Sequence, residues 1–264
     1  MGGGLGIRLE RENHELLTPA APLPQRRSMA ASRSGCWTIV SSELVSALRF
    51  IRGDDTVYTE YSSQFLMDYA CPAKASLKNQ KNGHYCYKYS PLKAMDFMIT
   101  DGLPREEHWP YQGCRKASPP VYTPPPPEYP HVYIASRKSL RTLEEAMEKL
   151  ASHPIGAGLA IFTPDYQMIK GGIYRGPMYR ESKFEELHAV SLYRVGMEEG
   201  EAIGYVKSTH GELIGEKGCL KVSLEVLMVE VPQEGREADD EFKKPKRLLS
   251  RFFYPELPPR EVGV

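Results

Sequence analysis

The chain has 264 residues, 41% hydrophobic and 26% charged, values typical of a globular protein that buries a core. Its 34 basic and 34 acidic side chains give no net charge, which argues against a long-range field that attracts nucleic acid or an anionic membrane. The longest nearly uninterrupted apolar stretch, Ile155 to Phe162, is too short to span a bilayer. We therefore expect neither a nucleic-acid nor a membrane partner.

The first part of the chain predicts helices after an irregular lead-in at residues 1–34, in which no apolar signal-peptide core is seen. From Cys36 to Arg52, apolar residues recur at the spacing of one helical face, and Gly53 stands where a cap is expected. Two shorter helices are predicted as well, and residues 35–118 form a helical half. Their ranges are Ser62–Tyr69 and Pro91–Ile99.

Residues 119–131 are rich in proline, with seven prolines in the twelve residues from Pro119 to Pro130. Such a run favours the extended polyproline II conformation. The first interpretation is a linker between two halves. The alternative is a docking segment for a proline-motif-binding domain of the SH3 or WW type.

The second half, residues 132–231, predicts a sheet. A capped helix at Thr142–Ala151 comes first, and the apolar period then changes to two, with glycine at the turns. Residues 232–264 predict a charged tail and a C-terminal segment, in which a short basic run, Lys243–Arg247, is most simply a solvated surface. The expected strands are Ile155–Phe162, His188–Val195, Ala202–Lys207 and Gly218–Glu230.

Cys36 is the first candidate for chemistry, because it stands at the start of the strongest predicted helix. Unpaired backbone N–H groups and the helix dipole favour the nucleophilic thiolate there. A buried structural cysteine is the alternative. The chain has five cysteines, so at least one thiol is left over from any set of disulfides.

Several segments resemble, in the correct order, those of the papain-like cysteine peptidases. The Gly35-Cys36-Trp37 start of the first helix resembles the family's nucleophile helix. Leu187-HAVSLYRVG-Gly196 resembles the strand that opens with the catalytic histidine. The other similar segments are Glu60–Cys71, Pro91–Cys114, Ile169–Pro177 and Ser250–Pro255.

The resemblance implies an α+β fold, in which a helical left half and a β-barrel-like right half have the active-site cleft between them. Cys36 would attack a peptide carbonyl, and His188 would take the thiol proton and later protonate the leaving amine. Ser208 stands at the position of the family's orienting asparagine. Cys71 and Cys114 match a family disulfide.

Three departures from the family pattern predict reduced activity. Ala30 replaces the glutamine that completes the oxyanion hole, a loss of about 10²–10³ in rate. His210 replaces the tryptophan that shields the histidine, and bulky side chains replace the glycines that face the substrate. The predicted cleft residues are Trp37, Tyr87, Lys88, Tyr89 and His210.

The sequence thus predicts a monomeric cysteine peptidase of reduced activity that acts on peptide or protein substrates, with no cofactor and no metal. A catalytically inactive papain-fold protein that binds or regulates a partner is the alternative, and an acyl transferase would use the same residues. Members of the family are usually lysosomal, vacuolar or extracellular, and the sequence leaves the compartment undetermined.

Overall fold

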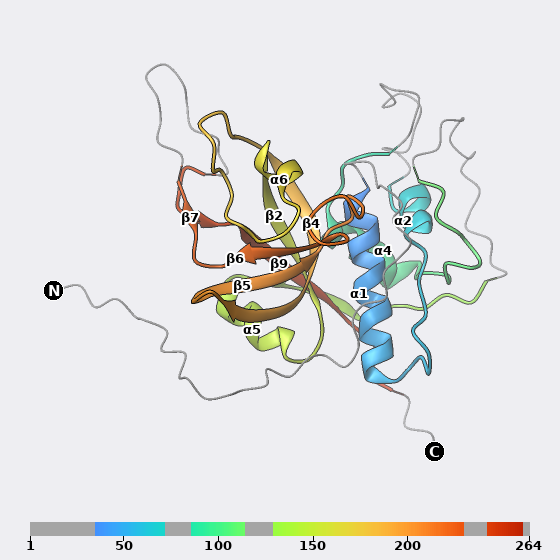
Figure 1. Ribbon diagram of the computed structural model, residues 1–264. Helices are drawn as coiled ribbons and strands as arrows, with labels where there is room; N and C mark the ends of the chain where they lie inside the picture. The colour runs from blue at the N-terminus through green and yellow to red at the C-terminus, as the bar shows by residue number, and fades with distance from the viewer. Residues whose placement is uncertain (1–34, 72–85, 114–128, 230–241, 261–264) are drawn as a thin grey trace.

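The helix that begins at Cys36 runs through the centre of the molecule. In a computed structural model, which describes residues 35–71, 86–113, 129–229 and 242–260, α1 spans Cys36–Arg52, as predicted. It buries Val40, Leu44 and Val45, and it ends at Gly53, whose φ of 75° suits a residue without a side chain. Figure 1 shows α1 with the sheet on one side and the short helix at Ser63–Tyr69 on the other.

Two further helices pack beside α1. α2 spans Ser63–Tyr69 and is capped by Ser62, whose Oγ accepts a hydrogen bond from the Phe65 N–H at 3.0 Å. α4 spans Pro91–Thr100 and begins with proline, as the sequence predicts. Together these helices enclose an aromatic-rich core, whose largest fully buried side chains are Trp37, Tyr61, Phe65, Leu44 and Leu66.

Seven strands form a second layer with the order β1-β9-β2-β4-β5-β6-β3. All neighbours are antiparallel except β3 and β6, which are parallel. The bounds are Ser136–Leu140 (β1), Ile155–Thr163 (β2), Ile173–Tyr174 (β3), Lys183–Glu198 (β4), Glu201–Lys207 (β5), Cys219–Ser223 (β6) and Leu249–Glu256 (β9).

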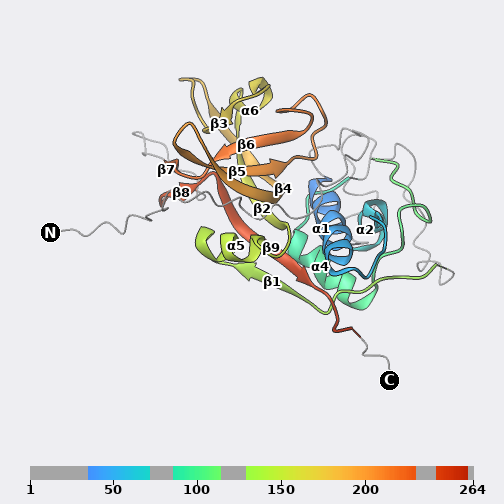
Figure 2. The same ribbon diagram turned by 60° about the horizontal axis from the view of Figure 1, so that its bottom comes forward.

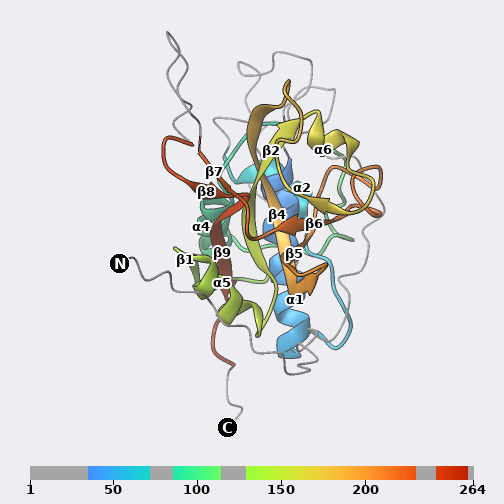
Figure 3. The ribbon, with the colours of Figure 1, turned by 60° about the vertical axis from the view of Figure 1, so that its left-hand side comes forward.

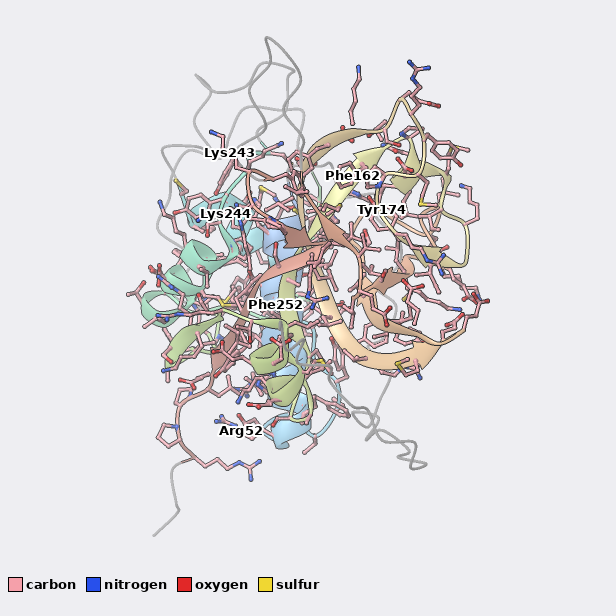
Figure 4. The ribbon with its side chains drawn as sticks, turned by 90° about the vertical axis from the view of Figure 1, so that its left-hand side faces the viewer. Arg52, Phe162, Tyr174, Lys243, Lys244 and Phe252 are labelled. Atoms are coloured by element: carbon pink, nitrogen blue, oxygen red, sulfur yellow. The ribbon has the colours of Figure 1, made fainter. Side chains whose placement is uncertain are left out.

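Smaller elements complete the sheet side. α5 (Leu143–Leu150) is capped by Thr142 and packs against the sheet, as Figure 2 shows. α6 (Asp165–Met168) follows β2, and a separate pair, β7 (Leu227–Met228) and β8 (Lys246–Arg247), lies at one edge, as Figure 3 shows. In Figure 4 Phe162 and Tyr174 lie close together, and the Tyr174 hydroxyl accepts from the Phe162 N–H at 2.9 Å.

Several strands differ from the sequence prediction. β1, β3, β8 and β9 were not predicted as strands, and β4 begins five residues before the predicted start at His188. β9 lies inside the sheet between β1 and β2. The strand predicted at Gly218–Glu230 is two short strands, β6 and β7. Among the described residues, no helix is long and apolar enough to cross a membrane.

A buried carboxylate fastens α1 to the sheet. Glu43 is 3% exposed; its Oε2 accepts from the Ser191 hydroxyl of β4 at 2.7 Å, and its Oε1 pairs with the Lys207 ammonium of β5. Ser191 lies three residues after His188, and Lys207 directly precedes Ser208. One side chain of α1 therefore fixes the two strands that present the predicted catalytic residues.

Candidate active site

The Cys36 thiol lies at the beginning of α1 and against β4. It is partly buried, and the backbone of Ala189, the residue after His188, lies near enough to the sulfur to lower the pKa of the thiol. Burial raises the pKa of the Cys36 thiol, and the nearby Glu186 carboxylate raises it further. The expectation that the helix start produces a thiolate is therefore corrected, because desolvation outweighs the backbone hydrogen bonds that favour the anion.

His188 is fully buried on β4, opposite Leu159 of β2. Burial lowers the pKa of His188 well below its usual value, and the neighbouring His210 lowers it further. The two imidazole rings are stacked, with centroids 3.8 Å apart and planes at 24°. His210, at the position of the expected tryptophan, therefore covers His188 with another ring.

The two nitrogens of the His188 ring have different environments. Nε2 lies 3.2 Å from the Ser208 Oγ, so the shorter serine side chain does reach the imidazole. Nδ1 is buried and has no hydrogen-bond partner within the described part of the chain. The fold thus places Cys36 beside the backbone next to His188, without a hydrogen bond between thiol and imidazole.

Tyr166 of α6 adds a hydroxyl that the sequence reasoning missed. It lies 2.6 Å from the Ser208 Oγ and 3.1 Å from the His210 Nδ1, and its side chain is buried. No local pattern marks this tyrosine as functional, because its role depends on contacts with residues more than 20 positions away. A buried chain of hydrogen bonds therefore joins His188, Ser208, Tyr166 and His210.

On the helical side, two of the predicted cleft residues belong to the packed core. Trp37 is 1% exposed and donates its indole N–H to the Tyr87 carbonyl at 2.8 Å. The Tyr87 hydroxyl donates to the Met67 carbonyl at 3.1 Å, so Tyr87 is also directed inward. Tyr89 packs edge-on against the Trp37 ring. These aromatic rings pack against one another and hold the segment around Tyr87 in place, rather than forming an open surface for a substrate.

Lys88 connects the two sides of the molecule. Its ammonium forms an ion pair with Glu186, which lies on β4 two residues before His188. The Lys88 side chain is 71% exposed and the Glu186 side chain 13%. Because the Glu186 charge also acts on the Cys36 thiol, this ion pair lies close to the predicted nucleophile.

The cysteines differ from the expectation. Cys71 has a free thiol, so the predicted bridge between Cys71 and Cys114 is not formed, and Cys86 is disulfide-bonded instead. Cys114 and the oxyanion position Ala30 lie outside the described residues, as does most of the proline-rich segment. The described part of the chain contains no group of three or more metal-ligating side chains.

Comparisons with known proteins agree with this architecture. The family model "Papain family cysteine protease" matches residues 30–234. The Arabidopsis thaliana protein HEAT-INDUCED TAS1 TARGET 4 is 28% identical over 83% of this chain and 86% of its own length. Macrodontain-1 of Ananas macrodontes is 24% identical over 73% of this chain and 80% of its own length.

Solved structures share the fold at low sequence identity. The bromelain protease from Ananas comosus aligns with a TM-score of 0.61 at 18% identity, over 86% of this chain and 93% of its own. The Carica candamarcensis cysteine protease CMS1MS2 aligns with a TM-score of 0.59 at 19% identity, over 89% of this chain and 92% of its own. The α+β, papain-like fold class is thus confirmed.

Proposed function

Because the chain belongs to the papain family of cysteine proteases, we propose that it is a cysteine peptidase of reduced activity, with Cys36 as nucleophile and His188 as proton acceptor. The observation that supports this most is the position of the Cys36 thiol, at the start of α1 and against the Ala189 backbone beside His188. The sulfur would form an acyl-enzyme, and His188 would return the proton to the leaving amine.

The reduced activity follows from the protonation states of the Cys36 thiol and the His188 imidazole. Burial holds the thiol protonated and the imidazole neutral, so both must change state before attack. The His188 Nδ1, which must accept the thiol proton, makes no hydrogen bond within the described residues. Ala30 cannot donate to an oxyanion, which costs about 3–4 kcal/mol of transition-state stabilisation.

An epoxysuccinyl activity probe tests this proposal. It should label Cys36 between pH 4 and 8, faster at higher pH because a raised pKa leaves little thiolate at low pH. The Cys36→Ala variant controls for reaction at the other free thiols, Cys71 and Cys219. Absence of label at Cys36 throughout that range refutes catalytic function.

One observation favours a second candidate, a catalytically inactive papain-fold protein that binds or regulates a partner. The ion pair of Lys88 and Glu186 joins the two sides of the molecule near Cys36, where an extended peptide would have to lie. Cleavage of a peptide library that depends on Cys36 would exclude this candidate.

Two partner predictions extend the proposal. The chain acts as a monomer, which its mass in solution tests against the 29.8 kDa of one chain. The alternative to a linker at residues 119–131, a docking segment for a proline-motif-binding domain, is tested with a peptide. Failure of a peptide of this sequence to bind a panel of SH3 and WW domains would refute the second prediction.

A further inference from the structure

Four side chains, from β4, from α6 and from the segment after β5, form one hydrogen-bond chain that is buried except at His210. The chain starts at the His188 Nε2, passes through the Ser208 Oγ and the Tyr166 hydroxyl, and reaches the His210 Nδ1. His188 is 0% exposed, Tyr166 2% and Ser208 6%, so bulk water does not compete for these bonds. The Tyr166 ring also packs edge-on against both imidazoles, with centroids 6.3 Å from His188 and 5.6 Å from His210.

We propose that Tyr166 is a positioning residue, which acts through Ser208 to fix the tautomer and the orientation of His188. This inference rests on the proposed function, because the tautomer matters for a histidine that accepts the thiol proton. A serine hydroxyl can donate as well as accept, whereas the carbonyl of an asparagine side chain only accepts. Ser208 alone therefore leaves the His188 tautomer undefined, and a further group must set it.

The Ser208 Oγ has two lone pairs and one hydrogen, and the His210 backbone N–H donates to it at 3.3 Å. Its contacts with His188 and Tyr166 fit two opposite proton arrangements. In the arrangement that we assign, Ser208 accepts from the His188 Nε2–H and gives its own hydrogen to the Tyr166 oxygen. Tyr166, whose pKa burial raises, then donates to the His210 Nδ1. His188 then keeps an open lone pair on Nδ1, the atom that must receive a proton from Cys36.

Without the tyrosine hydroxyl the direction reverses. The Ser208 hydrogen loses its acceptor and turns to the His188 Nε2, so that the imidazole proton moves to Nδ1. A ring with a proton on Nδ1 cannot take one from a thiol. The volume of the ring is the same in phenylalanine, so packing around His188 is kept while the hydrogen-bond direction changes.

The test uses the full chain with nitrogen-15 in its histidine rings, and NMR to report which nitrogen of His188 is protonated. We expect Nε2–H in the parent protein and a shift towards Nδ1–H in Tyr166→Phe. Tyr174→Phe is the matched control, because its buried hydroxyl bonds only the backbone, accepting from the Phe162 N–H and donating to the Ala160 carbonyl. An unchanged tautomer in Tyr166→Phe, or an equal shift in Tyr174→Phe, overturns the proposal.

A second pair of measurements separates this proposal from the proposed function. Labelling of Cys36 by the epoxysuccinyl probe should fall on the order of 10²-fold in Tyr166→Phe, as for a misplaced catalytic group. The double variant Tyr166→Phe/Ser208→Asn should recover both the Nε2–H tautomer and the labelling, because an amide carbonyl accepts from Nε2–H without help. If Cys36 is never labelled but the tautomer shifts as described, the proposed function fails and the positioning role of Tyr166 stands.

Discussion

The buried ion pair between Glu43 and Lys207 offers a quantitative test of how α1 is held against the sheet. Substitution of Glu43 by alanine removes the carboxylate that binds the Lys207 ammonium and the Ser191 hydroxyl. The Glu43 side chain is 3% exposed and the Lys207 side chain 16%. Removing one partner of such a pair costs about 3–5 kcal/mol, because the other charge stays in a poorly solvated place.

We expect the lower end of that range, about 3 kcal/mol, because Lys207 is not completely shielded from water. This is a large share of the roughly 5–15 kcal/mol that stabilises a typical folded protein. The double variant Glu43→Met/Lys207→Met removes both charges and should be neutral, or more stable than the parent by up to about 4 kcal/mol. The losses of unfolding free energy in the two single variants therefore should not add up to the effect of the double variant.

Urea unfolding of the parent, Glu43→Met, Lys207→Met and the double variant measures this coupling, and Glu43→Ala is unfolded beside them. Asp96→Ala is the control, because it removes an exposed ion pair with Arg137 and should cost at most about 1 kcal/mol. If Glu43→Ala costs no more than Asp96→Ala, the pair does not fasten α1 to the sheet. Loss of Cys36 labelling in Glu43→Ala, measured while the variant is still folded, would link this contact to the site.

Four further predictions concern the site. The rate at which iodoacetamide alkylates Cys36 should still rise above about pH 8.5, the ordinary pKa of a thiol, because burial raises the pKa of Cys36. A rate that reaches a plateau below that pH would reveal a preformed ion pair between the Cys36 thiolate and His188, and would contradict the burial argument. The double variant Lys88→Met/Glu186→Gln removes the ion pair without leaving a bare carboxylate beside Cys36, and it should speed probe labelling of Cys36 by up to about fivefold, since an exposed ion pair is worth at most about 1 kcal/mol. An equal rate in Glu107→Met, which breaks an exposed pair elsewhere, would count against this prediction. Ala30→Gln and Ser208→Asn together should raise the rate of peptide hydrolysis more than either alone, and a double variant no more active than the parent refutes this prediction. Adding Tyr166→Phe should increase the gain, because the Tyr166 hydroxyl lies 2.6 Å from the Ser208 Oγ, where the longer asparagine side chain needs room. Because folding lowers the pKa of His188, its contribution to stability is present above about pH 6.5 and is lost as the pH falls. Urea unfolding of His188→Gln should therefore show a smaller loss of stability at low pH than the parent, and the contribution of buried His153, which has the same sign, is retained in both proteins. Parallel curves of unfolding free energy against pH for the two proteins would contradict the assignment.

Local patterns in the sequence determined much of the helical side. The spacing of apolar residues and the glycine after Arg52 defined α1 to the residue, and Thr142 and Pro91 marked two other helix starts. These signals are local, because caps and helical faces depend on neighbours within a few positions. The order of the family-like segments also identified the fold and predicted Cys36 and His188 as the catalytic pair.

Only the tertiary structure decided how the site is protonated and supported. The sequence placed Cys36 at a helix start, which favours a thiolate, but burial outweighs this effect and raises the pKa of the thiol. The free thiol of Cys71 and the position of β9 between β1 and β2 depend on contacts between distant segments. Tyr166 and Glu43 act through partners 42 and 148 residues away, respectively. Hydrogen bonds over such separations leave no periodic trace in the chain, so the fold alone brings them together.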